Sequence, residues 1–420
     1  MTAIFYNTDV VTDQAPPSDL IIPISARHGA NNSISRFMLP AEKATNTISL
    51  PRNIRRAVFT VSANGQASEE FWWSNVLETD VYTFNATAGP LPGLSPFREV
   101  QVLIDSQLAG VQWPFPVIFT GGVVPALHRP IVGIHAFDLR EHEIDITPFL
   151  PLLCDGQPHT FTIRVAGLNN TIPATLTETV NESWYVTGKL FLWLDPDSSF
   201  ITTGSMPTIH HPPPIITTAR ALTHSPNGTN DTLTYTVSAQ RTLRITSPDS
   251  SSWSQHLTYT NDATISAAGF TQSNNLLITG TDTASSSRHH HHHHTDNDDP
   301  SRHDSDHHTT AHPHDEEDYD GNTHPYHYYY QATYAHPLTV TSTYALSPQG
   351  NLSISARLKQ GKEVVVTGAS VFATGLEAFR GYVGKGLTSR LETVREGWAE
   401  YRATGDGMSS RGWGEVGQWF

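Results

Sequence analysis

The chain has 420 residues, of which 37% are hydrophobic, 10% are aromatic and only 15% are charged. Its length suffices for two domains of ordinary size or one elaborate domain. The formal net charge of −15 argues against a protein that binds the nucleic-acid backbone, and no apolar run approaches the roughly 20 residues of a membrane helix. The aromatic content is typical of a soluble, strand-rich protein.

The N-terminal part divides into an irregular segment and a strand-rich block. Residues 1–50 are rich in Pro, Asn and Ser and predict no regular structure. Over residues 51–205, short strands alternate with turns. A strand at Ala57–Ala63 precedes a hairpin-type turn at Asn64-Gly65, and Glu69–Trp73 is predicted as the next strand. Many short strands at this spacing predict an antiparallel β-sandwich.

The C-terminal part is predicted to be a second β-rich domain that follows a linker. Pro212–Pro214 interrupts the strand pattern, so residues 206–231 are predicted to be the linker and residues 232–385 the domain. Helical spacing of apolar residues then predicts a short C-terminal helix and tail over 386–420, from Leu387, Leu391, Val394, Trp398 and Tyr401.

A His- and Asp-rich stretch, residues 285–336, interrupts the second domain. It contains His289–His294, and residues 288–320 hold ten acidic residues against two Arg. Its low apolar content predicts a long disordered insertion. Histidine and carboxylate groups bind transition metals, so adventitious metal binding is expected there, but a defined metal site also needs fixed geometry. We therefore predict no functional metal site.

Seven Asn-X-Ser/Thr motifs indicate a secretory or vacuolar protein, and chance is the alternative because these residues are abundant. The motifs begin at Asn31, Asn85, Asn169, Asn181, Asn227, Asn230 and Asn351. The first residues contain neither a basic segment nor an apolar segment of a signal peptide. The only cysteine, Cys154, excludes an internal disulfide and is expected to be an inert buried thiol.

Carboxylates beside paired tryptophans form the first candidate site. Glu69 and Glu70 precede Trp72 and Trp73, and Asn75 follows. Tryptophan faces bind the apolar faces of sugar rings, and an adjacent carboxylate can act as an acid or a base. The alternative is a strand with buried tryptophans and surface glutamates.

A second constellation is predicted to be a long structured loop, where functional sites often lie. It begins with Trp113–Gly122, in which Pro and Gly residues disfavour a continuous ladder. Asp138, Glu143 and Asp145 follow and are either site carboxylates or capping and turn residues. The spacing does not decide between these alternatives. Motifs of serine hydrolases, zinc proteases, phosphate-binding loops and dinucleotide-binding folds do not occur.

Six ordered blocks of this sequence closely resemble the plant and fungal peptide N-glycanase A family of asparagine amidases. The blocks are Glu70–Asn75, Arg98–Asp105, Trp113–Gly122, Arg129–Ile131, Ala136–Leu139 and Ile144–Leu150. Weaker matches continue through Ser183–Val186, Leu192–Asp195, Trp253–Asn261 and Gly280–Asp282. Dense resemblance therefore covers about Leu50 to Asp195.

The resemblance implies secreted enzymes built on jelly-roll sandwiches that hydrolyse the amide between asparagine and N-acetylglucosamine, without a metal or another cofactor. The expected partners are N-glycopeptides or glycoproteins. A carboxylate base would activate water, and donors would stabilise the oxyanion. The catalytic candidates are Glu70 (placed first), Glu69, Glu99, Asp138 and the donor Arg129. The substrate-binding candidates are Trp72, Trp73, Asn75, Asp105 and Trp113.

Four departures from the family pattern keep other interpretations open. His128 stands where the family usually has Trp, and Trp73 where it has Tyr, and the His/Asp insertion is peculiar to this chain. Nothing before Leu50 resembles the family's long N-terminal section, so we expect a truncated or incomplete chain. The alternatives to an active glycoamidase are a non-catalytic glycan-binding sandwich and an inactive fragment.

Overall fold

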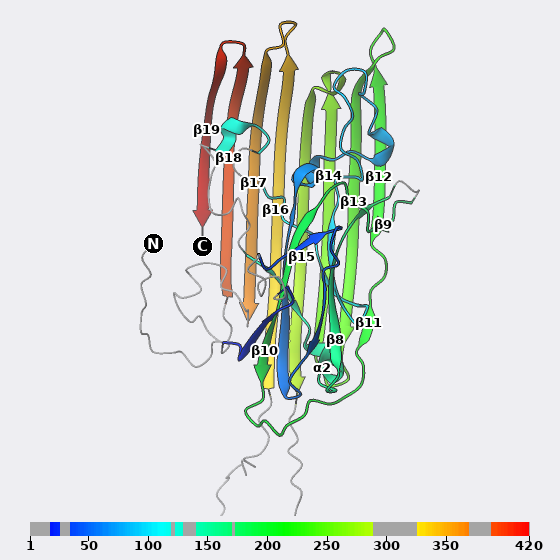
Figure 1. Ribbon diagram of the computed structural model, residues 1–420, viewed down its shortest axis with the longest axis vertical. Coiled ribbons are helices and arrows are strands. Elements are labelled where there is room, and N and C mark those ends of the chain that lie inside the picture. Colours follow the sequence, from blue (N-terminus) through cyan, green and yellow to red (C-terminus); the bar gives the residue numbers. More distant parts are fainter. Residues whose placement is uncertain are drawn as a thin grey trace, which may run out of the picture.

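The structure, a computed structural model, describes residues 17–25, 34–118, 122–128, 140–169, 173–288, 326–368 and 388–419. Strands dominate the described residues, and they form three antiparallel sheets (Figure 1). The one described α-helix is the short α2 (Leu150–Leu153). The all-β prediction is therefore confirmed.

Two of the sheets form a jelly roll, as the resemblance implied. The first contains, in spatial order, β1 (Leu20–Pro23), β10 (Trp184–Leu194), β4 (Ile54–Gly65) and β7 (His142–Asp145), with β2 (Phe37–Leu39) also paired to β10. The second contains β3 (Thr45–Ser49), β8 (Pro158–Leu168), β5 (Glu99–Ile104) and β6 (Gln107–Gln112), with β9 (Leu176–Thr177) also paired to β8. The connections from β2 to β3, β3 to β4, β4 to β5, β6 to β7, β7 to β8 and β9 to β10 cross between the two sheets, as in a jelly roll.

Alternating apolar side chains hold the jelly roll together. Phe161, Ile163 and Val165 of β8 share the inner face, as their alternation predicts. Phe161 stacks on Phe59 of β4 with 6.3 Å between ring centroids. Gly188 lies beside this pair, and a Cβ there would stand 2.6 Å from the Phe59 ring. The sheets therefore pack closely around side chains that have no room to expand.

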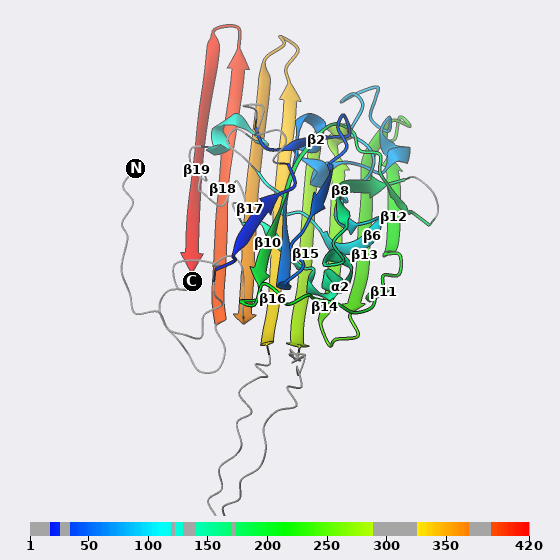
Figure 2. The ribbon, with the colours of Figure 1, turned by 60° about the horizontal axis from the view of Figure 1, so that its bottom comes forward.

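The third sheet has nine strands and is much larger. Its spatial order is β11 (Thr208–His210), β13 (Asn230–Thr246), β14 (Ser252–Ser266), β15 (Thr271–Arg288), β16 (Tyr326–Leu346), β17 (Leu352–Gly368), β18 (Thr388–Thr404) and β19 (Gly407–Trp419), with β12 (Ile215–His224) also paired to β13. Figure 2 shows the jelly roll lying against one face of this sheet.

The large sheet caps the edges of the jelly roll. Alternate residues of β13 to β17 face inward and are mostly apolar, whereas those between them are largely Thr, Ser and Asn. One hydrophobic core therefore runs through both parts. The edge strands β6 and β7 reach the large sheet through contacts from Val111 to Gln255 and from His142 to Asp282. The second β-rich region is thus one open sheet that buries its apolar face on the jelly roll.

Several predicted boundaries are wrong because local patterns missed long-range pairing. The segment 1–50, predicted to be irregular, contributes β1, β2 and β3, and the predicted linker 206–231 contains β11 and β12. β4 continues through the predicted Asn64-Gly65 turn because both residues pair with β10. The stretch Glu69–Trp73 is not a strand: it belongs to the 3₁₀ turns η1 (Ala67–Glu69) and η2 (Trp72–Ser74).

The predicted C-terminal helix is also wrong. Residues from Thr388 form β18, which pairs with β17 and β19 over its length. Arg395, Gly397 and Ala399 alternate inward, and a glycine there weakens a helix while allowing close packing on the sheet. The predicted insertion 285–336 is shorter at both ends, because β15 reaches Arg288 and β16 begins at Tyr326. Residues 289–325, with His289–His294, lie outside the described residues.

Candidate functional site

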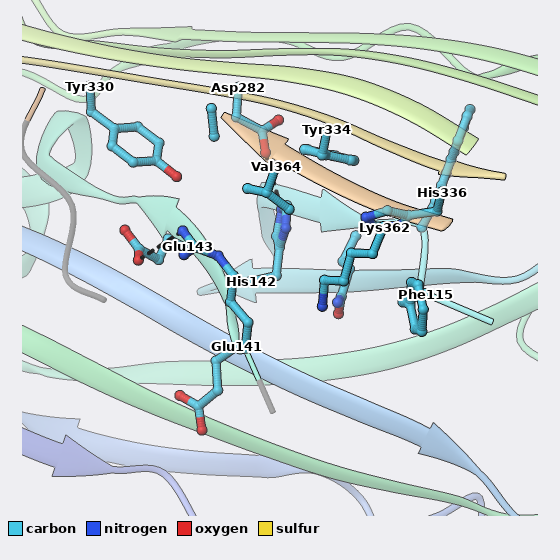
Figure 3. Close-up of a pocket in the computed structure, with 14 residues that line it drawn as sticks. Phe115, Glu141, His142, Glu143, Asp282, Tyr330, Tyr334, His336, Lys362 and Val364 are labelled. Carbon is cyan, nitrogen blue, oxygen red and sulfur yellow. Dashed lines mark ion pairs between the residues drawn. The ribbon is translucent and has the colours of Figure 1, made fainter. Parts of the chain in front are cut away.

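A cavity of about 50 Å³ lies where the jelly roll meets the large sheet. β7 and the residues around it contribute Arg140, Glu141, His142 and Glu143. The rest of the lining is Gln112, Trp113, Phe115, Asp282, Tyr330, Ala332, Tyr334, His336, Lys362 and Val364. Figure 3 shows Asp282 and Tyr330 reaching from the large sheet toward β7. Such a volume holds water but not a sugar ring, so a sugar would have to lie outside it in this conformation.

Buried polar atoms without partners concentrate around this cavity. Several of them form no hydrogen bond within the part of the chain that the structure describes: Gln112 Oε1, Arg140 Nη1, His142 Nε2, Tyr334 Oη and both ring nitrogens of His336. Most buried polar groups in proteins are hydrogen-bonded, and unpaired ones need a specific explanation. Their grouping at one cavity is typical of a place that binds water or a polar ligand.

An imidazole and a carboxyl group face each other across the two layers. His142 Nε2 on β7 lies 3.4 Å from Asp282 Oδ2 on β15. Burial raises the pKa of Asp282 to about 8, against the lowering effect of the hydrogen bond from Gln255. Burial, and then the charge of Arg140, lowers the pKa of His142 to about 4. Near pH 7 the pair is therefore a neutral acid beside a neutral imidazole, that is, a proton donor beside an acceptor.

Glu143 and Arg140 lie beside this pair. Arg140 Nη2 is 3.7 Å from Glu143 Oε1, and the Glu143 side chain is almost fully buried. Tyr330 faces them from β16: burial raises its pKa well above the usual value, and the charge of Glu143 adds to the effect. The group thus combines a carboxylate, a guanidinium and a neutral carboxylic acid in a buried space, where electrostatic interactions are stronger than in bulk water.

Lys362 and His336 line the other end of the cavity. Burial lowers the pKa of Lys362 to about 8, and its ammonium group lies 4.9 Å from the centre of the Phe115 ring. Burial, and then the charge of His142, lowers the pKa of His336 to about 3. Glu141 instead bonds to Thr60 and Lys189 on neighbouring strands, and Figure 3 shows it pointing away from Asp282. The groups whose pKa values are shifted therefore lie on one side of β7.

The sequence-predicted candidate Glu69 lies in a separate, saturated network. Both of its oxygens bind Arg98, at 2.6 and 2.7 Å, and Trp184 Nε1 and the Asn181 backbone N–H also donate to it. Burial favours a higher pKa for Glu69, but the hydrogen bonds and charge of Arg98 outweigh it and lower the pKa. The carboxylate is fully buried and holds loops together, with no free position for water.

Glu99, Trp113 and Asp105 also have structural partners. Glu99 is buried and accepts hydrogen bonds from Trp113 Nε1 and Gln101 Nε2. Arg241 Nη1 lies 3.0 Å away from it. Asp105, in the turn between β5 and β6, binds His159 Nδ1 at 2.7 Å and the Thr160 backbone. Among the predicted candidates that are described, Trp113 lines the cavity, and so does Glu143, which the sequence left open as a site carboxylate or a capping or turn residue.

The tryptophan pair forms no open platform in this structure. Trp72 and Trp73 are 3% and 2% exposed and pack in the core. The buried Asn75 accepts a hydrogen bond from Tyr235 through its backbone oxygen. Glu70 is partly exposed next to this turn. Stacking of a sugar on the pair would therefore require the core to open.

Asp138 and Arg129 lie outside the described residues. Asp282 and Tyr330 are not among the predicted site residues: Asp282 lies only in the weakly matching block Gly280–Asp282, and no local motif marks Tyr330. A signal for Asp282 exists: it is a charged residue at an inward position of β15, in line with Leu276, Ile278 and Ala284. No sequence motif marks His142.

The described residues contain neither a metal-binding cluster nor a membrane-spanning helix. No group of three or more His, Cys, Asp or Glu side chains there is arranged to hold a metal ion. No helix in these ranges has the length and apolarity needed to cross a bilayer.

Comparisons with known proteins match both parts of the chain. The family described as peptide N-acetyl-β-D-glucosaminyl asparaginase amidase A matches residues 1–210, and the PNGase_A C-terminal domain matches residues 234–298. Over 186 residues, the chain is 38% identical to the peptide-N4-(N-acetyl-β-glucosaminyl)asparagine amidase A of Prunus dulcis. That match covers 43% of this chain and 30% of the relative, so the chain spans less than a third of the relative's length. No solved structure matches.

Proposed function

The chain belongs to the peptide N-acetyl-β-D-glucosaminyl asparaginase amidase A family, and we propose that it hydrolyses the amide between asparagine and N-acetylglucosamine in N-linked glycopeptides. The observation that carries the proposal, beside the family, is the buried group formed by His142, Glu143 and Asp282 at the junction of the layers. Amide hydrolysis needs a base for water, a proton for the leaving nitrogen and donors for the oxyanion.

In the proposed mechanism, the Glu143 carboxylate takes a proton from a water molecule. The water oxygen bonds to the amide carbon, and Arg140 stabilises the oxyanion that forms. The carbon–nitrogen bond then breaks while Asp282 gives its proton to the leaving nitrogen. The products are an aspartic acid side chain and a glycosylamine. Transfer of the proton held by Glu143 back to Asp282 restores the site.

The pKa directions support this division of roles. A carboxyl group whose pKa burial raises to about 8 keeps its proton under mildly acidic conditions and can serve as the acid. The neutral state of His142 avoids a buried cation beside it. This assignment differs from the prediction of Glu70 as the base, which rests on the position of Glu70 beside the tryptophan pair. Glu70 lies beside η1 and does not line the cavity.

Mass spectrometry of an N-glycopeptide tests the proposal. The purified chain is incubated with the glycopeptide at mildly acidic pH in water enriched in oxygen-18. We expect intact released glycan and a peptide in which aspartate, carrying one heavy oxygen, replaces the glycosylated asparagine. An unchanged glycopeptide would contradict the activity. If the chain nevertheless bound that glycopeptide, the alternative of a glycan-binding protein would replace it.

We also propose that the protein acts in the secretory pathway or outside the cell. Asn85 and Asn227, each in an Asn-X-Thr motif, are exposed and free to carry a glycan. Mass spectrometry of the protein isolated from its natural source would detect glycans at these two positions. Unmodified asparagine at both would count against this compartment.

A further inference from the structure

Gln255 is a buried polar residue between two apolar positions of its strand. It lies on the inward face of β14 between Trp253 and Leu257, both fully buried, and is itself 3% exposed. Burying an amide side chain is costly unless all of its groups are hydrogen-bonded. A hydrophobic residue would satisfy the packing of this face, so the amide requires a specific explanation.

The amide of Gln255 acts as an extra strand partner for β6. Its Oε1 accepts the Val111 backbone N–H at 2.8 Å, and its Nε2 donates to the Val111 carbonyl oxygen at 2.9 Å. β6 is the edge of its sheet, and an edge strand directs unpaired backbone groups outward. Gln255 satisfies both outward groups of Val111 and thereby fixes the jelly roll on the large sheet at this point.

The amide nitrogen of Gln255 also forms a hydrogen bond with the carboxyl group of Asp282. Gln255 Nε2 donates to Asp282 Oδ1 at 2.9 Å from the adjacent strand β15. The other oxygen of Asp282, Oδ2, is the one that lies 3.4 Å from His142. A donor on Oδ1 leaves the proton of the neutral carboxyl group on Oδ2, directed toward β7.

From these contacts we propose that Gln255 is a positioning residue, which orients the proton donor Asp282 across adjacent strands of the large sheet and links this orientation to the seating of the jelly roll. The inference rests on the proposed function, because it concerns the acid of that reaction. Gln255 has two N–H groups, and Val111 and Asp282 use both. If the layers separated at β6, Gln255 would lose its hydrogen bonds to Val111 and its side chain could rotate. The orientation of Asp282, which depends on Gln255, would then no longer be fixed.

The groups around Asp282 define what the loss of Gln255 would change. The jelly roll presents His142, Glu143 and Arg140 to the cavity, β16 presents Tyr330 and Tyr334, and β17 presents Lys362. The hydrogen bond from Gln255 opposes the effect of burial on Asp282. Without it, the pKa of Asp282 is expected to rise above about 8, and the carboxyl group can rotate.

Gln255→Met tests the proposal, because methionine keeps the length of the side chain but donates no hydrogen bond. The titration of Asp282 is followed by carbon-13 NMR of labelled aspartates and assigned by its loss in Asp282→Asn. We expect the midpoint to rise by roughly 0.5–1 pH unit, the value of one hydrogen bond. In the glycopeptide assay, kcat should fall about tenfold or more, with little change in KM.

Gln360→Met is the matched control. Gln360 is a buried amide of β17 that donates to the Pro116 carbonyl at 2.6 Å, so it also joins the two layers, but it does not line the cavity. Gln360→Met should lower the melting temperature to a degree similar to that of Gln255→Met, and it should leave the midpoint of the Asp282 titration unchanged. Gln255→Leu repeats the measurement if Gln255→Met does not fold.

Two results would overturn the proposal. One is an Asp282 midpoint in Gln255→Met equal to that of the wild type, which would reduce Gln255 to a structural clamp. The other is a shift of equal size in Gln360→Met. The NMR measurement needs no turnover, so an inactive wild-type chain would contradict the proposed function while the midpoints still decide whether Gln255 controls Asp282.

Discussion

His142 and Asp282 approach each other to 3.4 Å although they are 140 residues apart and belong to different sheets. His142 lies on the edge strand β7 of the jelly roll, whereas Asp282 lies on β15 near the middle of the large sheet. The contact exists only because the large sheet covers the edge of the jelly roll. The site is thus a property of the assembled layers, and its proton chemistry depends on their packing.

Replacing Asp282 by asparagine should abolish most of the proposed activity. Asparagine keeps the shape and can still accept the hydrogen bond from Gln255, but it cannot release a proton. General acid catalysis is commonly worth about 10²–10⁴-fold in rate. We therefore expect kcat for glycan release to fall by about that factor, measured by mass spectrometry of the peptide product.

Asp262→Asn is the control for this substitution. Asp262 lies on β14 on the opposite, exposed face of the large sheet, where it accepts a hydrogen bond from Thr236. Its replacement should leave kcat within about twofold of the wild type, as for most surface substitutions. Equal rates in Asp282→Asn and the wild type would exclude Asp282 as the acid.

Stability should fall as the pH rises from about 6.5 to 8. The pKa of Asp282 is raised to about 8 in the folded chain, so the folded state binds more protons than the unfolded state in this range. The loss approaches about 1.4 kcal/mol per pH unit. The pKa of His142 is lowered to about 4, which has the opposite sign but acts only below its unfolded value of about 6.5.

Urea denaturation at a series of pH values measures this slope. Asp282→Asn should flatten it between pH 6.5 and 8, since asparagine does not titrate. His142→Gln should leave the slope in this range in place and change the curve at lower pH. A slope in Asp282→Asn equal to that of the wild type between pH 6.5 and 8 would show that Asp282 is ionised in the folded chain.

The sequence predicted what local patterns determine and missed what distant contacts determine. Alternation placed Phe161, Ile163 and Val165 on one inner face correctly, because a strand repeats every two residues. The structural role of Glu69 depends on Arg98, 29 residues away, and the place of Asp282 in the site depends on β7. Neither partner can be found from spacing. Helical spacing after Leu387 was misleading because pairing with β17 overrides local propensity.

Glu69→Gln should destabilise the fold strongly, whereas Glu70→Gln should not. Loss of the Glu69 charge leaves Arg98 buried without its partner, which costs about 3–5 kcal/mol. Glu70 is partly exposed, so its replacement should change the free energy of unfolding by less than about 0.5 kcal/mol. Urea denaturation of both variants measures the difference.

The Glu70→Gln variant also decides between two assignments of the catalytic base, Glu70 and Glu143. Glu70→Gln should retain glycan release, because Glu70 does not line the cavity. If the variant folded normally and lost turnover while still binding the glycopeptide, the original prediction of Glu70 as the base would be correct. The assignment to Glu143 would then fail.

Gly110→Ala should destabilise the chain through overpacking between the jelly-roll sheets. Gly110 lies on β6, and a Cβ there would stand 2.5 Å from Cγ2 of Ile144 on β7. Relief requires movement of a buried side chain, at a typical cost of about 1–3 kcal/mol. Gly405→Ala is the control, because no atom lies within 4 Å of the added methyl group, and it should change the free energy of unfolding by less than about 0.5 kcal/mol. Equal stabilities of the two variants in urea would mean that β6 and β7 do not face each other across the core as described.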